Sequence, residues 1–231
     1  MTFVQIIECK TDRLDDLNRL MDTWAEQTRG RRTAGHAMVT TNRADSKHVV
    51  EIVEFASYEE AMQNSHLPET DRIFREMVAL CEEPPTFTDL DVVRDAQFNK
   101  ATATRLLGEV SRGNLDVIDE LMAADYCDHD FASEGDAMGT AAFKERCGGY
   151  VGAFDFTFEI ESQIAEGDEV ATRWTWHATQ KADFMGMPST GKSVVGRGTT
   201  TFRFADGMIK EGWWQWDVMG LMRQLGMMPG S

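Results

Sequence analysis

The sequence predicts an α+β protein built from two domains. Its 231 residues suit two small domains, since a domain usually has roughly 100 to 200 residues. In the first part, segments with strand and helix periodicity follow one another in the order βαββαβ, whereas in the second part helical segments precede a run of strands. With 42% hydrophobic and 10% aromatic residues, the chain has enough apolar material for a real core.

The first domain is expected over residues 1–95 and begins with a strand and a helix. Residues 3–8 form a short apolar run that is typical of a strand. The apolar residues of the next segment repeat at helical spacing and share one face, which consists of Leu14, Leu17, Leu20, Met21 and Trp24. This helix should end near Gly30, because glycine is favoured just after a helix.

A hairpin, a second helix and a last strand complete this domain. Residues 36–41 and 48–55 are β-rich and flank a polar segment of hairpin-loop length. Pro68 opens the second helix, the Pro84-Pro85 pair stops it, and residues 87–93 give the last strand. The order βαββαβ is ferredoxin-like. By element order alone it resembles dimeric α+β barrel domains, such as small cofactor-independent antibiotic-biosynthesis monooxygenases, and an interface or scaffold role is expected.

The second domain is expected over residues 101–231 and places helices before strands. Apolar residues repeat at helical spacing over 106–110 and 115–122, and a third helix is expected at 139–154. Four β-rich segments follow, at 155–164, 169–180, 193–204 and 208–217. Helices followed by a sheet indicate an α+β domain.

Charge and composition exclude several classes of partner. The net charge is −16, and such an acidic surface repels nucleic-acid phosphates and anionic lipid. No apolar run approaches the roughly 20 residues that span a bilayer, and the N-terminus lacks the pattern of a signal peptide. We therefore expect a cytoplasmic protein that binds neither nucleic acid nor membrane.

No cofactor or metal is expected either. The four cysteines contain no Cys-x-x-Cys pair, so reduced thiols are expected in place of disulfides or a zinc site. Residues 186–193 match the spacing of a phosphate-binding P-loop. A P-loop is followed by a helix, whereas residues 194–204 of this chain are β-rich, so a P-loop is rejected.

Four segments of the second domain occur in an order that resembles a known family. They are Ala-Asp-Tyr-Cys-Asp-His-Asp at 124–130, Ala-Glu-Gly-Asp-Glu-Val-Ala-Thr-Arg-Trp at 165–174, Phe-Met-Gly-Met-Pro-Ser-Thr-Gly-Lys at 184–192, and residues 206–226, which open with Asp-Gly-Met-Ile-Lys-Glu. Over about residues 101–228 the chain is similar to the SnoaL-like polyketide cyclases. This resemblance implies the cone-shaped fold of nuclear transport factor 2 (NTF2), in which helices pack on a curved sheet.

The resemblance also implies a catalytic residue. The family's general acid and base falls on Asp217, and Glu211-Gly212-Trp213 departs from the Glu-His-Trp that many members carry. Seen from the residues alone, an aspartate near several tryptophans is a plausible base, because apolar surroundings raise its pKa. The alternative is that Asp217 caps a helix over 218–225, since aspartate is a favoured N-cap.

Side-chain alternation along the last strand divides its residues into two faces. Trp213, Gln215 and Asp217 share one face, while Trp214 and Trp216 share the other. On the first face, Trp213 would contact substrate, and Gln215 would orient Asp217 or donate a hydrogen bond to substrate.

The strand at 169–180 alternates in the same way. Arg173 and His177 lie on a polar face, and Trp174 and Trp176 on an aromatic one. If the polar face turned inward, Arg173 and His177 would stabilise an enolate oxygen; if the aromatic face did, Trp174 would stack on a flat substrate. The sequence does not decide between them.

His129 lies between two acids, Asp128 and Asp130, and has three interpretations. A metal site is disfavoured, since neighbours on a strand point to opposite sides and only the two aspartates could converge. His129 could instead line the mouth of the cone as a second acid or base, or simply belong to a loop.

The leading functional hypothesis is a cofactor-independent, homodimeric cyclase. By the resemblance, it would close a ring of a small polycyclic or polycarbonyl substrate by intramolecular aldol addition, with Asp217 moving the proton. One alternative is a non-catalytic small-molecule binding or assembly protein on the same fold. Another is a hydrolase or isomerase, although Arg173-Trp174-Thr175 has threonine where limonene-epoxide-hydrolase-like enzymes need aspartate.

Overall fold

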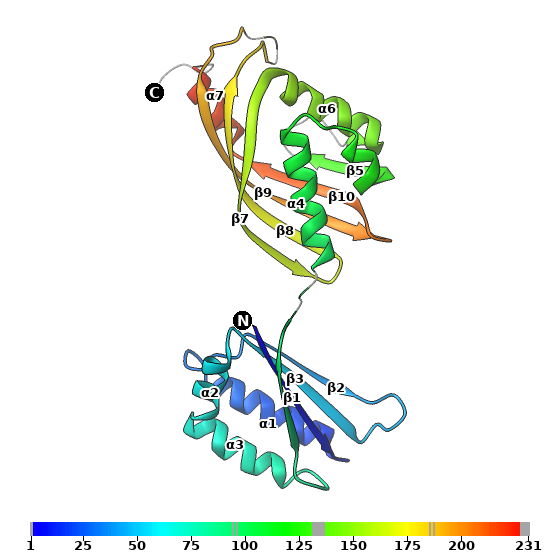
Figure 1. Ribbon diagram of the computed structural model, residues 1–231, viewed down its shortest axis with the longest axis vertical. Helices are drawn as coiled ribbons and strands as arrows, with labels where there is room; N and C mark the ends of the chain where they lie inside the picture. Colours follow the sequence, from blue (N-terminus) through cyan, green and yellow to red (C-terminus); the bar gives the residue numbers. More distant parts are fainter. Residues whose placement is uncertain are drawn as a thin grey trace. The chain divides into compact units, whose positions relative to one another are not determined.

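The structure is a computed structural model that divides into two compact units, Met1–Asp95 and Ala96–Ser231 (Figure 1). It describes residues 2–93, 95, 97–130, 137–184, 186 and 188–226, without the side chains of Asp130 and Ala137. No helix in these ranges is long and apolar enough to cross a membrane.

The first unit is a four-stranded antiparallel sheet with helices on one face (Figure 1). The strand order is β2-β3-β1-β4. Its elements are β1 (Phe3–Lys10), α1 (Leu14–Gln27), β2 (His36–Thr41), β3 (His48–Phe55), α2 (Tyr58–Ser65), α3 (Pro68–Val78) and β4 (Thr86–Asp91). The predicted strands at 36–41 and 48–55 are confirmed, whereas the short helix α2, capped by Ser57, was not predicted.

The core of this unit lies between the sheet and its helices. Val49 of β3 packs there with Leu17 of α1 and Ile73 of α3, all nearly inaccessible to solvent. The opposite face of the sheet has no covering helix within the unit, and strands β2 and β4 are exposed along their whole length. This unit therefore buries only one side of its sheet.

The second unit packs helices against a curved six-stranded sheet (Figure 1). The strand order is β6-β5-β10-β9-β8-β7, with β5 and β10 parallel and the other neighbours antiparallel. Its elements are α4 (Phe98–Ser111), α5 (Val117–Leu121), β5 (Met122–Asp130), β6 (Ala137–Met138), α6 (Gly139–Ala153), β7 (Phe154–Glu166), β8 (Glu169–Gln180), β9 (Ser193–Ala205), β10 (Met208–Trp216) and α7 (Val218–Leu225).

One continuous core joins α4 and α6 to the inner face of this sheet. The α+β class is confirmed, as are the helix expected near 139–154 and the four strands after it. Strands β5 and β6 were not predicted, and Met122, expected in a helix, begins β5. Because β5 pairs with β10 in parallel, it carries its inward side chains to the end of the core beneath α6.

Candidate functional site

A cavity of about 90 Å³ lies between α4, α6 and the sheet of the second unit. Its wall is almost entirely apolar and mostly aromatic, and consists of Leu106, Leu107, Val110, Asp128, Phe143, Arg146, Cys147, Tyr150, Phe156, Phe158, Trp174, Trp176, Trp214 and Trp216. Only two of these side chains, Asp128 and Arg146, carry charge. The cavity is therefore an aromatic pocket with one charged end.

The alternation of side chains along β8 and β10 builds the aromatic wall. Trp174 and Trp176 point inward from β8, and Trp214 and Trp216 point inward from β10. The indoles meet across the intervening strand β9, with ring centroids 6.3 Å apart for Trp174 and Trp214 and again for Trp176 and Trp216. The aromatic face of β8, one of the two arrangements that the sequence left open, is the inner one.

Strand β9 makes room for Trp174. A Cβ atom at Gly198 would lie 2.6 Å from the indole carbons of Trp174 and 2.7 Å from the carbonyl oxygen of Gln215. Only glycine fits such an approach, so the indole lies directly over the backbone of β9. The indole N–H of Trp174 donates a hydrogen bond of 2.9 Å to Oγ1 of Thr200, two residues along the same strand. This residue of the wall is thus held by packing and by a hydrogen bond.

The charged end of the cavity is a buried network on β5 and α6. Asp128 has no solvent-exposed surface, and its Oδ2 accepts a hydrogen bond from Nη1 of Arg146. Its Oδ1 accepts a hydrogen bond of 3.1 Å from the hydroxyl of Tyr126, which is also fully buried. A carboxylate removed from water is costly unless it is paired and hydrogen-bonded, and these two contacts provide both.

Tyr126 stays protonated at neutral pH. Burial raises the pKa of Tyr126 well above its usual range, and the charge of Asp128 acts in the same direction. The indole N–H of Trp214 faces the tyrosine oxygen and opposes this rise in pKa, without forming a hydrogen bond of regular geometry. The phenol is therefore a fixed hydrogen-bond donor to Asp128.

Gly212 of β10 provides the space for this phenol. A Cβ atom there would overlap the Tyr126 hydroxyl and would lie 3.1 Å from ring carbons of Phe202. Gly212 is the position at which the sequence departs from the Glu-His-Trp of many SnoaL-like proteins. In this chain a tyrosine from β5 occupies the inner space beside that position.

Asp217 lies elsewhere. It is exposed to solvent, does not line the cavity, and its Oδ1 accepts a hydrogen bond of 2.7 Å from the backbone N–H of Gly220. Asp217 is the N-cap of α7, so the helix-cap interpretation is confirmed. The structure does not bring the predicted catalytic aspartate to the pocket.

Three further candidates lie on the outer face of the sheet, because their neighbours on β10 and β5 point inward. His129 stacks on Trp213, with ring centroids 5.0 Å apart and planes inclined by 15°. Nε2 of His129 lies 3.2 Å from Oε2 of Glu211. Gln215, also on this face, is exposed. His129, Trp213 and Gln215 therefore do not line this cavity, and their contact with substrate stays a prediction.

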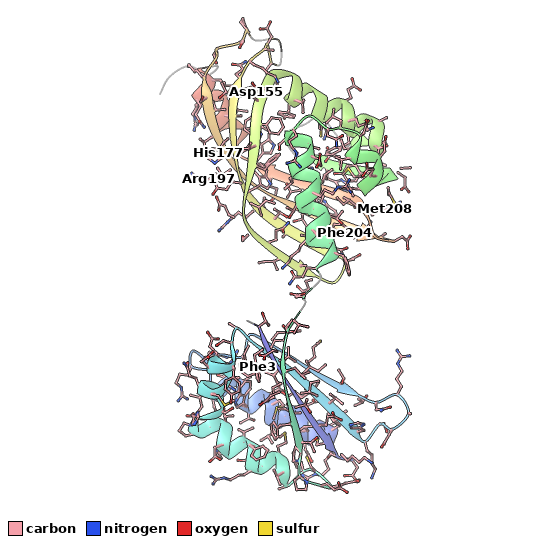
Figure 2. All side chains as sticks on the ribbon, in the orientation of Figure 1. Phe3, Asp155, His177, Arg197, Phe204 and Met208 are labelled. Atoms are coloured by element: carbon pink, nitrogen blue, oxygen red, sulfur yellow. The ribbon has the colours of Figure 1, made fainter. Side chains whose placement is uncertain are left out.

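Arg173 and His177 are on the outer face as well. Nε of Arg173 is 2.9 Å from Glu161, and Nε2 of His177 is 3.1 Å from Glu159. Figure 2 shows His177 on the side of the sheet turned away from α4. Of the predicted binding residues, the structure places Trp174 alone in the cavity wall.

The acidic segment of β5 shows no metal site in the described residues. No group of three or more histidine, cysteine, aspartate or glutamate side chains is arranged there for a metal ion. The side chain of Asp130, which the sequence could pair with Asp128, lies outside the described part. Within the described part, Asp128 is directed toward Arg146 and Tyr126.

Sequence reasoning missed the residues that form the charged end of the pocket. Asp128 was considered only as a metal ligand, and Tyr126 and Arg146 were assigned no role. One signal was present: Tyr126 and Asp128 are two residues apart on a strand and must share a face.

Comparisons with known proteins agree with this fold. The profile of the SnoaL-like polyketide cyclases matches residues 101–225, more than half of the chain. No curated protein matches.

Several solved structures resemble the second unit. A candidate polyketide cyclase from Acidithiobacillus ferrooxidans is 31% identical, with a TM-score of 0.52, over 60% of this chain and 99% of that one. AclR, a candidate hydroxylase from Streptomyces galilaeus, is 29% identical, with a TM-score of 0.53, over 58% and 100%. A candidate SnoaL-like cyclase from Jannaschia sp. CCS1, 23% identical with a TM-score of 0.54 over 62% and 99%, shares the fold.

The matched residues include all the elements that enclose the cavity, from α4 to β10. The second unit therefore has the NTF2-like fold, and the chain belongs to the SnoaL-like polyketide cyclase family.

Proposed function

We propose that the second unit catalyses cofactor-independent proton transfer next to a carbonyl group, as the first step of an intramolecular aldol ring closure. Asp128 would remove the α-proton, and Arg146 would stabilise the enolate oxygen. The observation that carries this proposal is the buried carboxylate of Asp128 at the one charged end of an aromatic cavity. Among the described residues that line this cavity, Asp128 is the one carboxylate.

Each member of the network suits one part of this chemistry. A guanidinium presents several fixed N–H donors and stays charged, so Arg146 suits an oxygen that gains negative charge. Tyr126 donates to one oxygen of Asp128 and fixes the carboxylate while it exchanges a proton. The aromatic wall keeps water away, which strengthens both interactions.

The size of the cavity limits what it can hold. At about 90 Å³ it is well below the roughly 300–1,000 Å³ of pockets that enclose a whole drug-sized ligand. We propose that the reacting carbonyl end of the substrate enters between the tryptophans, while the rest of the molecule stays outside.

Exchange of deuterium into a simple aryl ketone tests the proton transfer without the natural substrate. We propose to follow exchange at the α-carbon of 1-indanone in D₂O by NMR, with the wild-type protein, Asp128→Asn and Asp217→Asn. Loss of a general base should slow exchange by at least about 100-fold in Asp128→Asn. Asp217→Asn is the matched control, since asparagine caps a helix about as well as aspartate.

The result separates the candidates. If Asp217→Asn abolishes exchange and Asp128→Asn does not, the resemblance-based assignment of Asp217 is right and the cavity assignment is wrong. If the wild-type protein binds the ketone without promoting exchange, the alternative of a non-catalytic binding protein is favoured. Circular dichroism of each variant checks the fold, and Tyr126→Phe gives a milder test, with slower exchange expected.

The first unit fits a role in assembly. We propose that it is a ferredoxin-like domain that pairs with a second copy, supported by its strand order and by its uncovered sheet face. That face carries an apolar strip of Val4, Ile6, Met38, Val50, Ile52 and Leu90, of which Met38 is 41% and Leu90 42% exposed. Sedimentation should give a dimer mass, and Ile52→Lys should give a monomer; a monomeric wild-type protein at micromolar concentration would refute the pairing.

A further inference from the structure

The first unit contains a cavity of its own, on the covered side of its sheet. It has a volume of about 330 Å³, within the range of small-molecule sites, and lies between the sheet and its helices. Its wall includes Trp24, Phe55, Phe74 and Phe87. None of the described side chains that line it is a lysine, arginine or histidine.

A glutamate sits in the middle of this apolar layer. Glu51 lies on the same face of β3 as the buried Val49 and Val53, so its carboxyl group points toward the helices. No hydrogen bond or ion pair reaches this carboxyl group from any described residue. Burial raises the pKa of Glu51. A leucine would pack more favourably here, so the glutamate is a cost that the fold itself does not require.

A second acceptor in the same wall also lacks a partner. Asn64, at the end of α2, is 6% exposed, and its Oδ1 is buried without a hydrogen bond. Buried polar atoms are almost always satisfied, so an orphan acceptor that lines a cavity points to a missing donor. Another polar group of the wall, the indole N–H of Trp24, is already bound to Oγ1 of Thr70 at 3.0 Å. The wall therefore presents two hydrogen-bond acceptors that lack donors, the carboxyl group of Glu51 and Oδ1 of Asn64.

We infer that this cavity binds an uncharged aromatic molecule of one to three rings whose hydroxyl group donates hydrogen bonds to Glu51 and Asn64. The aromatic wall fits the rings, and the acceptors fit the hydroxyl group. An anion is disfavoured, because Glu51 lines the cavity and none of the described lining residues is a cation that would offset its charge; Asp71, also in the wall, is already paired with Arg75. This site lies within the first unit and is independent of the function proposed for the second.

Binding of 2-naphthol to the full chain tests the inference. Calorimetric titration should show saturable binding to the wild-type protein. Two neutral or anionic relatives serve as ligand controls: 2-methoxynaphthalene, which lacks the donor, and 2-naphthoate, which carries a negative charge. Both should bind at least about tenfold more weakly, equivalent to about 1.4 kcal/mol.

Two substitutions of the same kind locate the site. Glu51→Leu removes the inward carboxyl group and should weaken 2-naphthol binding by at least about tenfold, equivalent to about 1.4 kcal/mol, without lowering the melting temperature. Glu54→Leu changes the same strand on its outer face, near His36, and should leave binding unchanged. Asn64→Ala provides a second variant and should also weaken binding.

The inference is overturned by any of three results. They are the absence of saturable 2-naphthol binding, equal binding by Glu51→Leu and Glu54→Leu, and binding of 2-methoxynaphthalene or 2-naphthoate as tight as that of 2-naphthol.

Discussion

The close approach of Trp174 to Gly198 gives a quantitative prediction for the wall of the cavity. An alanine Cβ at position 198 would lie 2.6 Å from the indole and 2.7 Å from a backbone oxygen, so one of the two strands or the indole must move. Overpacking of this kind costs about 1–3 kcal/mol. Displacement of the indole also weakens its hydrogen bond to Thr200, at about 0.5–1.5 kcal/mol. Alanine also lowers the conformational entropy of the unfolded chain relative to glycine, which stabilises the folded state by about 0.4–1 kcal/mol.

We therefore expect Gly198→Ala to lower the free energy of unfolding by about 2 kcal/mol, within a range of about 0.5–4 kcal/mol, measured by urea denaturation with an unchanged m-value. Gly196→Ala is the matched control, two residues away on the same face. There the new Cβ would lie 3.5 Å from Trp176, an ordinary contact, so the unfolding free energy should stay within about 1 kcal/mol of the wild-type value. If the two variants were equally stable, the indole would not lie over Gly198, and the described wall would be wrong.

Three other predictions concern the network and its surroundings. Arg146→Met should lower the free energy of unfolding by about 3–5 kcal/mol, since it removes the guanidinium that pairs with the buried carboxylate of Asp128. By the same denaturation assay, Arg203→Met on the outer face should cost about 1 kcal/mol or less, and equal losses would contradict the burial of the inner pair. The hydrogen bond from Arg203 lowers the pKa of Glu211 below its ordinary 4.5. The stabilisation by ionised Glu211 is therefore complete above pH 4.5 and is lost as the pH falls through the lowered pKa. Glu211→Gln should make the unfolding free energy depend less on pH in this acid range, and an unchanged dependence would refute the assignment. Burial raises the pKa of the Cys147 thiol to about 12, so a thiol reagent at pH 8 should label it only after unfolding, as peptide mass spectrometry can check.

Strands with regular alternation between clear turns could be predicted from the sequence. The strands at 36–41, 48–55 and 169–180 have the predicted bounds, because apolar and polar residues alternate there and glycine or polar segments follow. The eight residues of α2 form too short a helix for periodicity to identify, and their start depends on the Ser57 cap.

Strand β5 was missed for a reason connected to the site. Its inward positions include Met122, Tyr126 and Asp128, so a charged residue occupies a place where the pattern requires an apolar one. Functional residues often break the local pattern in this way. An inward aspartate makes the strand resemble a polar loop.

The sequence could not place the cavity, because alternation gives two faces without saying which is buried. On β10 the acids and Gln215 suggested a polar active face, while Trp214 and Trp216 supplied the apolar area that the core needed. Burial of aromatic area decides such a choice, since each ring removes far more apolar surface from water than a polar side chain does. The buried acid then came from a neighbouring strand, which periodicity within β10 could not reveal.

The most direct test of the cavity assignment is a crystal structure of this protein with bound 1-indanone. We expect the ketone oxygen within hydrogen-bond distance of the Arg146 guanidinium, and its α-carbon facing the carboxylate of Asp128 between the tryptophans. A ketone bound instead on the outer face, beside Trp213 and Asp217, would contradict the account.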